Sequence, residues 1–458
     1  MVLTRRVAAL ALLLAAVCWA IEREPLAAYQ QRRQALATRH ADGVVLLFAY
    51  SEQEGQFTRS PFRQENNFYY LSGWNEPGAV VCLLGKGRAG PYREILFVPG
   101  RETSHEAWTG PRLGPDDPQA TEKTGFGEVL DLKELPEVVS AALDGRRRIY
   151  TPIRRDSPGY DQPPEPDRGS RLEQLAPGYP IVNIRESFDS MRQIKSDGEV
   201  RLIRKASDAT IAAHRAAWDR MAPGVYEYQI SATMLGVMMD LGCLRPAYTP
   251  IIGSGGNSTV LHYSQATRRL GSGELVVIDV GGEYGHYAAD ITRTVPVDGR
   301  FTQRQREIYE IVLGAQRAAL DAIRPGMSLG GHGDKSLTEI VRAYFNSHGS
   351  DADGESLGRY FNHGLGHHVG LEVHDPGDAG QPLRPGMVVT IEPGLYLPHE
   401  GIGVRIEDMV LVTEDGAEVL TKELPKDPGE IERLMQAEPR GSASAWAPIP
   451  NGSRRVTP

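Results

Sequence analysis

The fold is decided by the run Glu274-Leu-Val-Val-Ile-Asp279-Val-Gly-Gly-Glu-Tyr-Gly-His-Tyr-Ala-Ala-Asp290-Ile-Thr-Arg-Thr294. Its apolar, mostly β-branched start predicts a buried strand, and Ala289 to Val297 predicts a second. A two-residue turn at Tyr284-Gly285 would join them as a hairpin, with Asp279 directly opposite Asp290. Like charges at opposed positions destabilise a sheet, so this register indicates a cation between the two carboxylates.

Two more carboxylates lie in strand-like settings further along the chain. Glu392 ends the apolar run from Met387 and precedes the turn signal Pro393-Gly394. Glu407 follows Ile402-Gly-Val-Arg-Ile406. An acid within an apolar strand must be paired or must hold a metal. A purely structural network of acids and arginines would explain one such residue, but four acids with histidines close by favour a metal centre.

Five residues then form an ordered series with distinctive flanking motifs: Asp279, Asp290, His367 in His363-Gly-Leu-Gly-His367, Glu392 in Glu-Pro-Gly, and Glu407 in Arg-Ile-Glu-Asp. The series closely resembles the pita-bread metallopeptidases, in the branch of Xaa-Pro aminopeptidase (aminopeptidase P) and prolidase. The resemblance covers the chain apart from its two ends. It implies an α+β fold, with a curved antiparallel sheet covered by helices and a smaller α/β domain before it. It also implies a homo-oligomer, either a dimer or a tetramer.

The same resemblance implies the roles of the metal ligands. Asp279 binds one ion, His367 and Glu392 bind the other, and Asp290 and Glu407 bridge the two. Four carboxylates and one imidazole carry too much charge for one ion with an open position, which favours two divalent cations. Oxygen-rich ligation with one histidine favours Mn²⁺, with Co²⁺ or Zn²⁺ as alternatives. Glu392 is also expected to shuttle the proton from water to the leaving nitrogen.

Four further residues are expected to have catalytic roles. By resemblance, His262 and His374 would hydrogen-bond the scissile region and stabilise the tetrahedral intermediate, and His363 would line the pocket. Arg405 shares a strand face with Glu407 and is expected to orient a carboxylate. Tyr396 is a weaker candidate for the pocket, and His368 is expected to be structural.

The expected function is removal of an amino-terminal residue from peptides with proline in second position. Prolidase, which acts on Xaa-Pro dipeptides, is the alternative, and methionine aminopeptidase is a more distant one. A non-catalytic pita-bread binding protein and a metal-free relative such as creatinase are alternatives of another class. Loss of ligands would be the signature of both, and all five ligand positions are filled.

The chain divides into four predicted parts: residues 1–20 as a signal peptide, 22–188 as an aminopeptidase P-type α/β domain, 189–435 as the pita-bread domain and 436–458 as a disordered tail. The segment Arg63-Gln-Glu-Asn-Asn-Phe-Tyr-Tyr-Leu-Ser-Gly73 carries the resemblance of the second part. Arg5-Arg6 followed by the short apolar run Val7 to Val17 is typical of a signal peptide and predicts an exported protein, periplasmic or secreted. Twin-arginine export and an uncleaved anchor are alternatives, and no other stretch is a candidate for a membrane span.

Composition restricts the partners. The 458 residues are 40% hydrophobic and 24% charged, with a net charge of −9, as in a globular protein for which nucleic acid is not the main partner. The cysteines are Cys18, Cys82 and Cys243. Removal of a signal peptide leaves two, which indicates free buried thiols or at most one bridge.

Local signals predict several elements. Strands are expected at Gly43–Ala49, Ala79–Leu84 and Glu94–Val98. Helices are expected over Asp197–Met221, capped by Ser196 or Asp197, over Glu227–Leu241, and from Thr302, which starts a capping box. The aromatic residues Phe68, Tyr69 and Tyr70 and the methionines Met234, Met238 and Met239 are expected to pack in the core.

Overall fold

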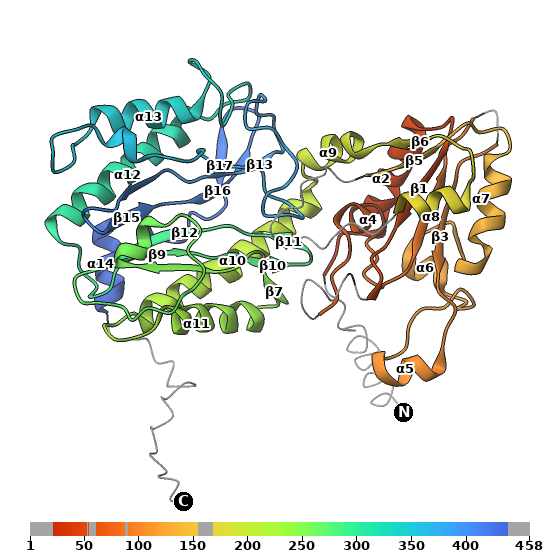
Figure 1. Cartoon of the computed structure of the whole chain (residues 1–458), viewed down its shortest axis with the longest axis horizontal. Helices are drawn as coiled ribbons and strands as arrows, with labels where there is room; N and C mark the ends of the chain where they lie inside the picture. Colours follow the sequence, from red (N-terminus) through yellow and green to blue (C-terminus); the bar gives the residue numbers. More distant parts are fainter. Residues whose placement is uncertain (1–21, 53, 55–60, 88–89, 154–167, 438–458) are drawn as a thin grey trace, which may run out of the picture.

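The computed structural model describes residues 22–52, 54, 61–87, 90–153 and 168–437. The predicted signal peptide lies outside these residues, and so does the predicted tail apart from Gln436 and Ala437, of which Gln436 ends a helix. The chain forms two lobes (Figure 1). No helix within the described ranges is long and apolar enough to cross a membrane.

The first lobe is built on one mixed sheet with the strand order β4-β3-β2-β1-β5-β6. Neighbouring strands run antiparallel from β1 to β3 and parallel at both outer ends. The inner strands are buried along nearly their whole length, as the three predicted apolar runs require. The strands are β1 (Val44–Phe48), β2 (Val80–Leu84), β3 (Arg93–Val98), β4 (Glu128–Asp131), β5 (Ile149–Thr151) and β6 (Ile181–Asn183).

Helices surround this sheet, except that α5 (Thr103–Thr109) lies apart from it at the end of a long loop (Figure 1). The others are α2 (Leu26–Arg39), α4 (Asn66–Ser72), α6 (Ala120–Thr124), α7 (Leu135–Leu143), α8 (Arg168–Leu175) and α9 (Arg185–Gln193). The aromatic residues Phe68, Tyr69 and Tyr70 on α4 are almost fully buried, which confirms their predicted place in the core. Helix α9 lies between the lobes (Figure 1).

The second lobe contains four small antiparallel sheets, with the strand orders β11-β10-β7, β12-β9-β8, β13-β16-β17 and β14-β15. Antiparallel strands with separate helices confirm the predicted α+β class. The strands are β7 (Arg245–Pro246), β8 (Ile251–Ser254), β9 (Leu275–Asp279), β10 (Gly282–Tyr284), β11 (Tyr287–Ala288), β12 (Thr292–Pro296), β13 (Val388–Ile391), β14 (Gly394–Leu397), β15 (Ile402–Arg405), β16 (Asp408–Val412) and β17 (Ala417–Val419).

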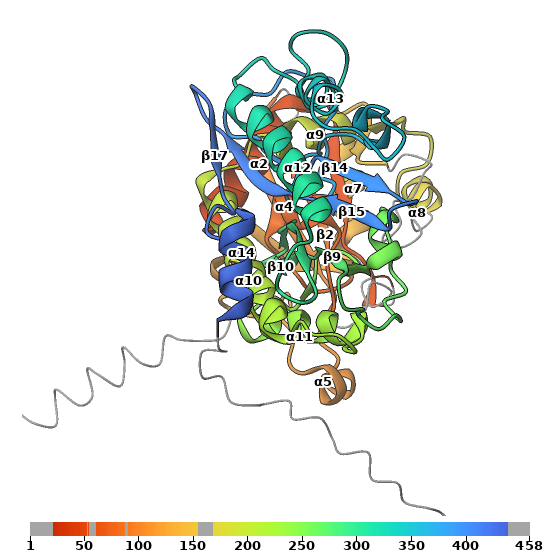
Figure 2. The ribbon, with the colours of Figure 1, turned by 90° about the vertical axis from the view of Figure 1, so that its left-hand side faces the viewer.

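Helices pack against these sheets, with α10 and α11 on one side of the strands and α12 and α13 on the other (Figure 1). Figure 2 views this lobe from its outer side, where α12 and α14 run along the surface. The helices are α10 (Asp197–Arg220), α11 (Glu227–Asp240), α12 (Gln303–Ala322), α13 (Leu337–Ser347) and α14 (Pro428–Gln436). The predicted caps are confirmed, because Ser196 accepts from the Glu199 amide and Thr302 from the Gln305 amide.

The hairpin that decides the fold forms, but in a different register from the prediction. Its turn is Gly285-His286, whose φ angles of 56° and 73° are both in the left-handed region. Asp279 is therefore paired with Thr292 rather than with Asp290. The shift moves Asp290 by two positions relative to the predicted pairing. Because side chains alternate with a period of two, Asp290 stays on the same face as Asp279.

A second prediction fails at helix α11. Met234 and Met238 are buried in the core, but Met239 is 63% exposed and does not pack there. Cys82 and Cys243 are both buried free thiols, as expected.

Candidate metal centre

The four candidate acidic ligands lie at or next to the ends of strands. Asp279 is the last residue of β9, Asp290 precedes β12, Glu392 directly follows β13, and Glu407 lies between β15 and β16. Hydrogen bonding in the backbone brings these ends together. The Glu392 amide donates to Leu365 O at 2.9 Å, and the Glu407 amide to Thr292 O at 3.0 Å.

A tyrosine hydroxyl joins the two aspartates. Tyr248 Oη lies 2.5 Å from Asp279 Oδ1 and 2.6 Å from Asp290 Oδ1. It can donate its single proton to only one of them at a time. The close contact confirms that the two carboxylates meet although they are not directly opposed in the ladder.

The side chain of Arg405 holds the other oxygen of Asp279. Its Nη2 lies 2.5 Å from Asp279 Oδ2, and its Nε donates to Thr292 Oγ1 at 3.2 Å. The Thr292 hydroxyl in turn donates to Glu407 Oε2 at 2.8 Å. Arg405 therefore reaches Asp279 directly and Glu407 through one hydroxyl group.

His367 faces the acids with one defined nitrogen. Its Nδ1 lies 3.1 Å from His368 O, and because a carbonyl oxygen only accepts, Nδ1 must carry the proton in this contact. This leaves Nε2, which lies 3.3 Å from Asp290 Oδ2 and 3.5 Å from Glu392 Oε1. A backbone carbonyl that fixes the tautomer in this way is the usual support of a metal-binding histidine.

The crowded charges shift the pKa values of the cluster. Burial raises the pKa of Glu407 well above its usual value, and the charge of Asp290 adds to the rise. Burial also raises the pKa of Glu392 to about 7, against the opposing effect of His367. Burial alone would lower the pKa of His367, but the carboxylates of Asp290 and Glu392 outweigh it and raise the pKa to about 9. These carboxylates are costly to ionise together without added positive charge.

The donor set fits a metal ion. Asp290, His367 and Glu407 offer ligand atoms that all lie within 4.8 Å of one another. Glu392 lies beside His367, and Asp279 is joined to Asp290 through Tyr248. All five predicted ligands therefore meet in one buried cluster. Carboxylates with one imidazole suit a hard or borderline divalent cation.

Histidines from two loops surround this cluster. The ring of His374 lies 4.2 Å from that of His367, nearly perpendicular to it. His363 Nε2 lies 3.0 Å from Tyr396 Oη, which also accepts a hydrogen bond from Arg405 Nη1 at 2.8 Å. Burial and then Arg405 lower the pKa of His363 to about 4. The residue before His262 lies beside this arginine, because Leu261 O accepts from Arg405 Nη2 at 3.4 Å. The histidines selected from the sequence thus lie at this site, while buried His368 pairs with Val389 in the backbone behind it.

Sequence reasoning missed three residues of the site. Tyr248 follows a short proline-containing strand and carries no motif signal. Thr292 links Arg405 to Glu407, and its place follows from the corrected register. Thr390 Oγ1 accepts from the His367 amide at 3.0 Å and donates to Glu392 Oε1 at 3.3 Å. The apolar-acid pattern that marked Glu392 also contains Thr390, but a threonine in a strand has many explanations.

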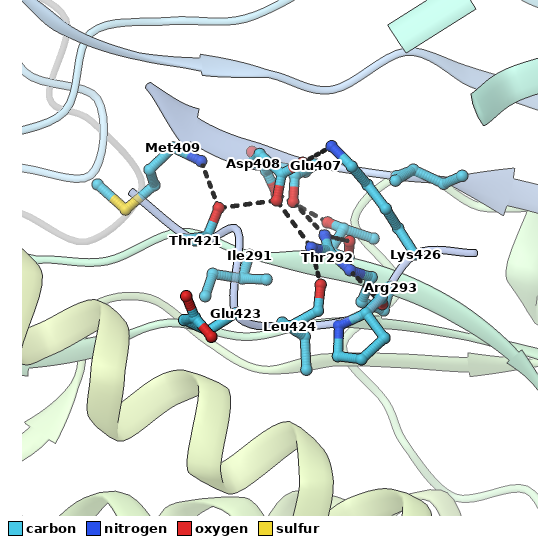
Figure 3. A network of polar contacts seen from close by, with 12 residues as sticks. Ile291, Thr292, Arg293, Glu407, Asp408, Met409, Thr421, Glu423, Leu424 and Lys426 are labelled. Carbon is cyan, nitrogen blue, oxygen red and sulfur yellow. Dashed lines mark hydrogen bonds and ion pairs between the residues drawn. The ribbon is translucent and has the colours of Figure 1, made fainter. Parts of the chain in front are cut away.

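A largely buried ion-pair network lies next to Glu407 (Figure 3). Arg293 donates to Glu407 O at 2.6 Å and to Asp408 Oδ1 at 2.7 Å. Asp408 also accepts from the Thr421 hydroxyl at 2.7 Å and pairs with Lys426 at 2.5 Å. Burial would raise the pKa of Asp408, but Arg293 and Lys426 outweigh it and lower the pKa to about 2. Arg293 and its ion pair with Asp408 therefore hold the backbone at Glu407 in place.

Comparison with known proteins places this site in a family. The profile described as "Metallopeptidase family M24" matches residues 201–414, and "Aminopeptidase P, N-terminal domain" matches residues 29–150. A protein from Escherichia coli named Xaa-Pro aminopeptidase is 37% identical over 441 residues, which cover 89% of this chain and 97% of the relative. The chain belongs to metallopeptidase family M24. As a member of this family, it is a metal-dependent peptidase.

Other proteins similar to this M24 peptidase indicate the same family. Human Xaa-Pro aminopeptidase 3 is 33% identical, over 81% of this chain and 76% of the human protein. A solved structure of aminopeptidase P from E. coli with the inhibitor Pro-Leu matches with a TM-score of 0.79 at 35% identity, over 90% of this chain and 99% of that one. A zinc-substituted form in complex with product matches with a TM-score of 0.78 at 34% identity, over 92% of this chain and 100% of that one. These likenesses confirm the predicted pita-bread fold with an amino-terminal domain.

Proposed function

We propose that this M24 peptidase removes the amino-terminal residue from peptides whose second residue is proline. The observation that carries the proposal is the meeting of Asp279, Asp290, His367, Glu392 and Glu407 in one buried cluster. The names of its relatives support the proline preference. Proline lacks an amide hydrogen and restricts the chain, so general exopeptidases handle this bond badly.

We further propose two divalent cations in the site, with Mn²⁺ favoured over Co²⁺ and Zn²⁺. Asp279 would bind one, His367 and Glu392 the other, and Asp290 and Glu407 both. The clustering of these four carboxylates around one imidazole supports this, and burial, with nearby carboxylates adding to it, raises the pKa values of Glu392 and Glu407. When bound, the metals polarise the peptide carbonyl and make water a better nucleophile.

The residues of the chain would supply the remaining chemistry. Glu392 takes a proton from the attacking water and returns it to the proline nitrogen as the bond breaks. His374, close to His367 at the exposed edge of the site, donates to the carbonyl oxygen as it gains charge, and His262 assists from its own loop. His363 and Tyr396 line the pocket, and Arg405 keeps Asp279 in place.

Prolidase activity is the competing function within the family. An Xaa-Pro dipeptide ends in a carboxylate directly after proline, whereas a longer peptide continues. The likeness over both domains to proteins named Xaa-Pro aminopeptidase favours the longer substrate. A non-catalytic binding protein is disfavoured by the complete ligand set.

The test is to load the protein with Mn²⁺ and measure release of the first residue from an Xaa-Pro dipeptide, an Xaa-Pro-Yaa tripeptide and the matched Xaa-Ala-Yaa tripeptide. We expect efficient cleavage of Xaa-Pro-Yaa alone. Preference for the dipeptide would favour prolidase, and equal cleavage of Xaa-Ala-Yaa would remove the proline specificity. A chain that binds these peptides without cleaving any would be a binding protein.

We also propose that the protein is exported and assembles as a homo-oligomer, a dimer or a tetramer. Arg5-Arg6 and the apolar run after it support export. Mass spectrometry of the native protein should find a chain beginning near Ile21, and an intact Met1 on a cytoplasmic form would refute export. Light scattering during size-exclusion chromatography should give a mass of two or four chains, and a monomer would refute assembly.

A further inference from the structure

The loop from His368 to Asp375 presents His374 to the metal centre. It is closed by a hydrogen bond of 2.9 Å from the Asp375 amide to His368 O. The hairpin between the two aspartates is attached to it, because the Ala288 amide donates to Gly370 O at 2.8 Å. A change in the shape of this loop would move the imidazole of His374 relative to His367.

A buried carboxylate holds the loop together from inside. The Asp375 side chain is almost completely inaccessible and accepts from the Glu372 amide at 3.2 Å. It pairs with Arg192 Nη2 at 2.6 Å and with Lys195 Nζ at 2.9 Å. Burial would raise the pKa of Asp375, but these two cations outweigh it and hold the pKa below its usual value. The anion of the loop is thus balanced by charges from elsewhere in the chain.

Both cations lie outside the part of the chain that matches the catalytic family. Arg192 is on α9 and Lys195 follows it, between the regions matched by the two family profiles. Arg192 Nη1 also donates to Asn67 Oδ1 at 2.9 Å, on α4 of the amino-terminal domain. The guanidinium group of Arg192 therefore connects α4 to the catalytic loop.

The amino-terminal domain contacts the same loop at two further points. Arg63 Nη2 donates to Leu371 O at 2.8 Å, and its Nε pairs with Glu283 of the hairpin at 2.6 Å. Asn66 Nδ2 donates to Glu372 Oε1 at 2.7 Å. In addition, Tyr69 stacks on His286 at the hairpin turn, with ring centroids 3.8 Å apart. These contacts reach the two catalytic segments that flank His367 and Asp290.

We propose that Arg192 is a positioning residue through which the amino-terminal domain holds the His368–Asp375 loop, and with it His374, in the geometry needed for turnover. The proposal rests on the proposed peptidase function for its kinetic part. The Arg192 side chain is only 2% exposed, so it acts through Asp375 rather than on the substrate. The amino-terminal domain is then needed for the chemical step within its own chain.

The test compares Arg192→Met with Arg33→Met in the full-length, metal-loaded protein. Arg33 is a matched control, because it is equally buried, pairs with Glu94 at 2.7 Å and donates to Leu71 O at 2.9 Å, but has no contact with the loop. We expect Arg192→Met to lower kcat on an Xaa-Pro-Yaa peptide by about 10- to 100-fold, the range for a misplaced catalytic group, with a smaller change in KM. Arg33→Met should lower the midpoint of thermal unfolding to a similar extent and leave kcat within a few-fold.

Two further measurements separate positioning from general destabilisation. In the His374→Ala background, Arg192→Met should cause little further loss of kcat, because the group that it positions is already gone. Hydrogen exchange of the amides of residues 369–375 should be faster in Arg192→Met and unchanged in Arg33→Met. The exchange measurement needs no activity. It therefore still tests whether Arg192 holds the His368–Asp375 loop if no Xaa-Pro peptide is cleaved.

Equal kinetic effects of the two variants, additive losses with His374→Ala, or unchanged exchange of the loop would each overturn the proposal. If Arg192→Met does not fold, Asn66→Ala replaces it. This change removes the hydrogen bonds of Asn66 with Glu372 and with Arg63, both of which contact the loop, and it should give the same pattern with a smaller loss of kcat.

Discussion

The guanidinium group of Arg405 lies 2.5 Å from the Oδ2 atom of Asp279, in the candidate metal centre. Both side chains are largely buried, so neither charge is compensated by water. Tyr248 is in contact with Oδ1 of the same carboxylate. The orientation of Asp279 is therefore fixed at both oxygens before any metal binds.

Replacement of Arg405 by methionine should weaken metal binding by about 10- to 100-fold, the usual effect of losing a partner behind a ligand. Isothermal titration of the metal-free protein with Mn²⁺ measures this directly. Arg304→Met is the control, because Arg304 pairs with Glu400 through two nitrogens at 2.8 and 2.9 Å, away from the site. Unchanged Mn²⁺ affinity in Arg405→Met would show that Asp279 does not depend on the ion pair.

Gln316 should affect the site through the backbone of two ligand segments. Its Nε2 lies 3.1 Å from Ile391 O and 3.1 Å from Ile406 O, the carbonyls just before Glu392 and Glu407. We expect Gln316→Ala to lower both the free energy of unfolding, by about 1–3 kcal/mol, and the affinity for Mn²⁺.

Gln305 provides the matched control on the same helix. Its Nε2 donates to Gly273 O at 2.8 Å and its Oε1 accepts from the Thr302 amide at 2.9 Å, and neither partner belongs to a ligand strand. Gln305→Ala should lower the stability by a similar amount and leave Mn²⁺ affinity unchanged. Equal Mn²⁺ affinities in the two variants would mean that Gln316 stabilises the fold and has no separate effect on metal binding.

Two metal ions should be present in each active site. Asp290→Ala or Glu407→Ala removes a proposed bridge, and each should abolish most activity while circular dichroism stays that of the parent protein. Metal analysis by mass spectrometry, set against active-site titration, gives the number of ions. One ion or none in fully active protein would contradict the dinuclear centre.

Acid should remove the stability that Asp375 contributes. Because its pKa is lowered in the folded protein, this contribution is complete above the unfolded pKa of about 3.9 and is lost as the pH falls towards the folded pKa. Asp375→Asn should cost about 3–5 kcal/mol at neutral pH, the usual effect of breaking a buried pair. The difference from the parent protein should shrink below about pH 4.

Urea unfolding at a series of pH values measures that difference. Asp353→Asn, at an exposed aspartate, shows the effect of removing one surface charge. A difference between parent and Asp375→Asn that stays constant from pH 7 to pH 3 would contradict the assignment.

Much of this fold could be predicted from the sequence, because signals such as helix caps depend only on neighbouring residues. A serine or threonine three residues before a glutamate or glutamine places the start of α10 and of α12 without any tertiary information. The hairpin shows the limit of such signals. Tyr284-Gly285 and Gly285-His286 both contain glycine, and only the structure shows that His286 adopts a positive φ. Asp290 still lies on the predicted face of the sheet, because the register differs from the prediction by two residues.

Contacts between distant segments could not be read from spacing. Arg192 and Asp375 are 183 positions apart. From the sequence alone, Arg192 could be a surface cation on an amphipathic helix, and Asp375 an ordinary acid in a loop. Tyr248 reaches Asp279 and Asp290 from a segment without periodicity. The exposure of Met239 follows from how α11 is rotated against α10, which its uneven apolar pattern does not determine.

The role proposed for Glu392 is to transfer protons at a metal centre that cleaves Xaa-Pro bonds. The most direct test is steady-state kinetics of the parent protein and Glu392→Gln on an Xaa-Pro-Yaa peptide, with metal content matched and His368→Ala as the neighbouring control. Glutamine keeps the size and one oxygen but cannot accept and return a proton. We predict that Glu392→Gln lowers kcat by about 10²–10⁴ with a smaller change in KM, and that His368→Ala has a much weaker effect. A Glu392→Gln variant that stays within a few-fold of the parent, or a His368→Ala variant with a larger loss of kcat, would contradict the proton-transfer role of Glu392.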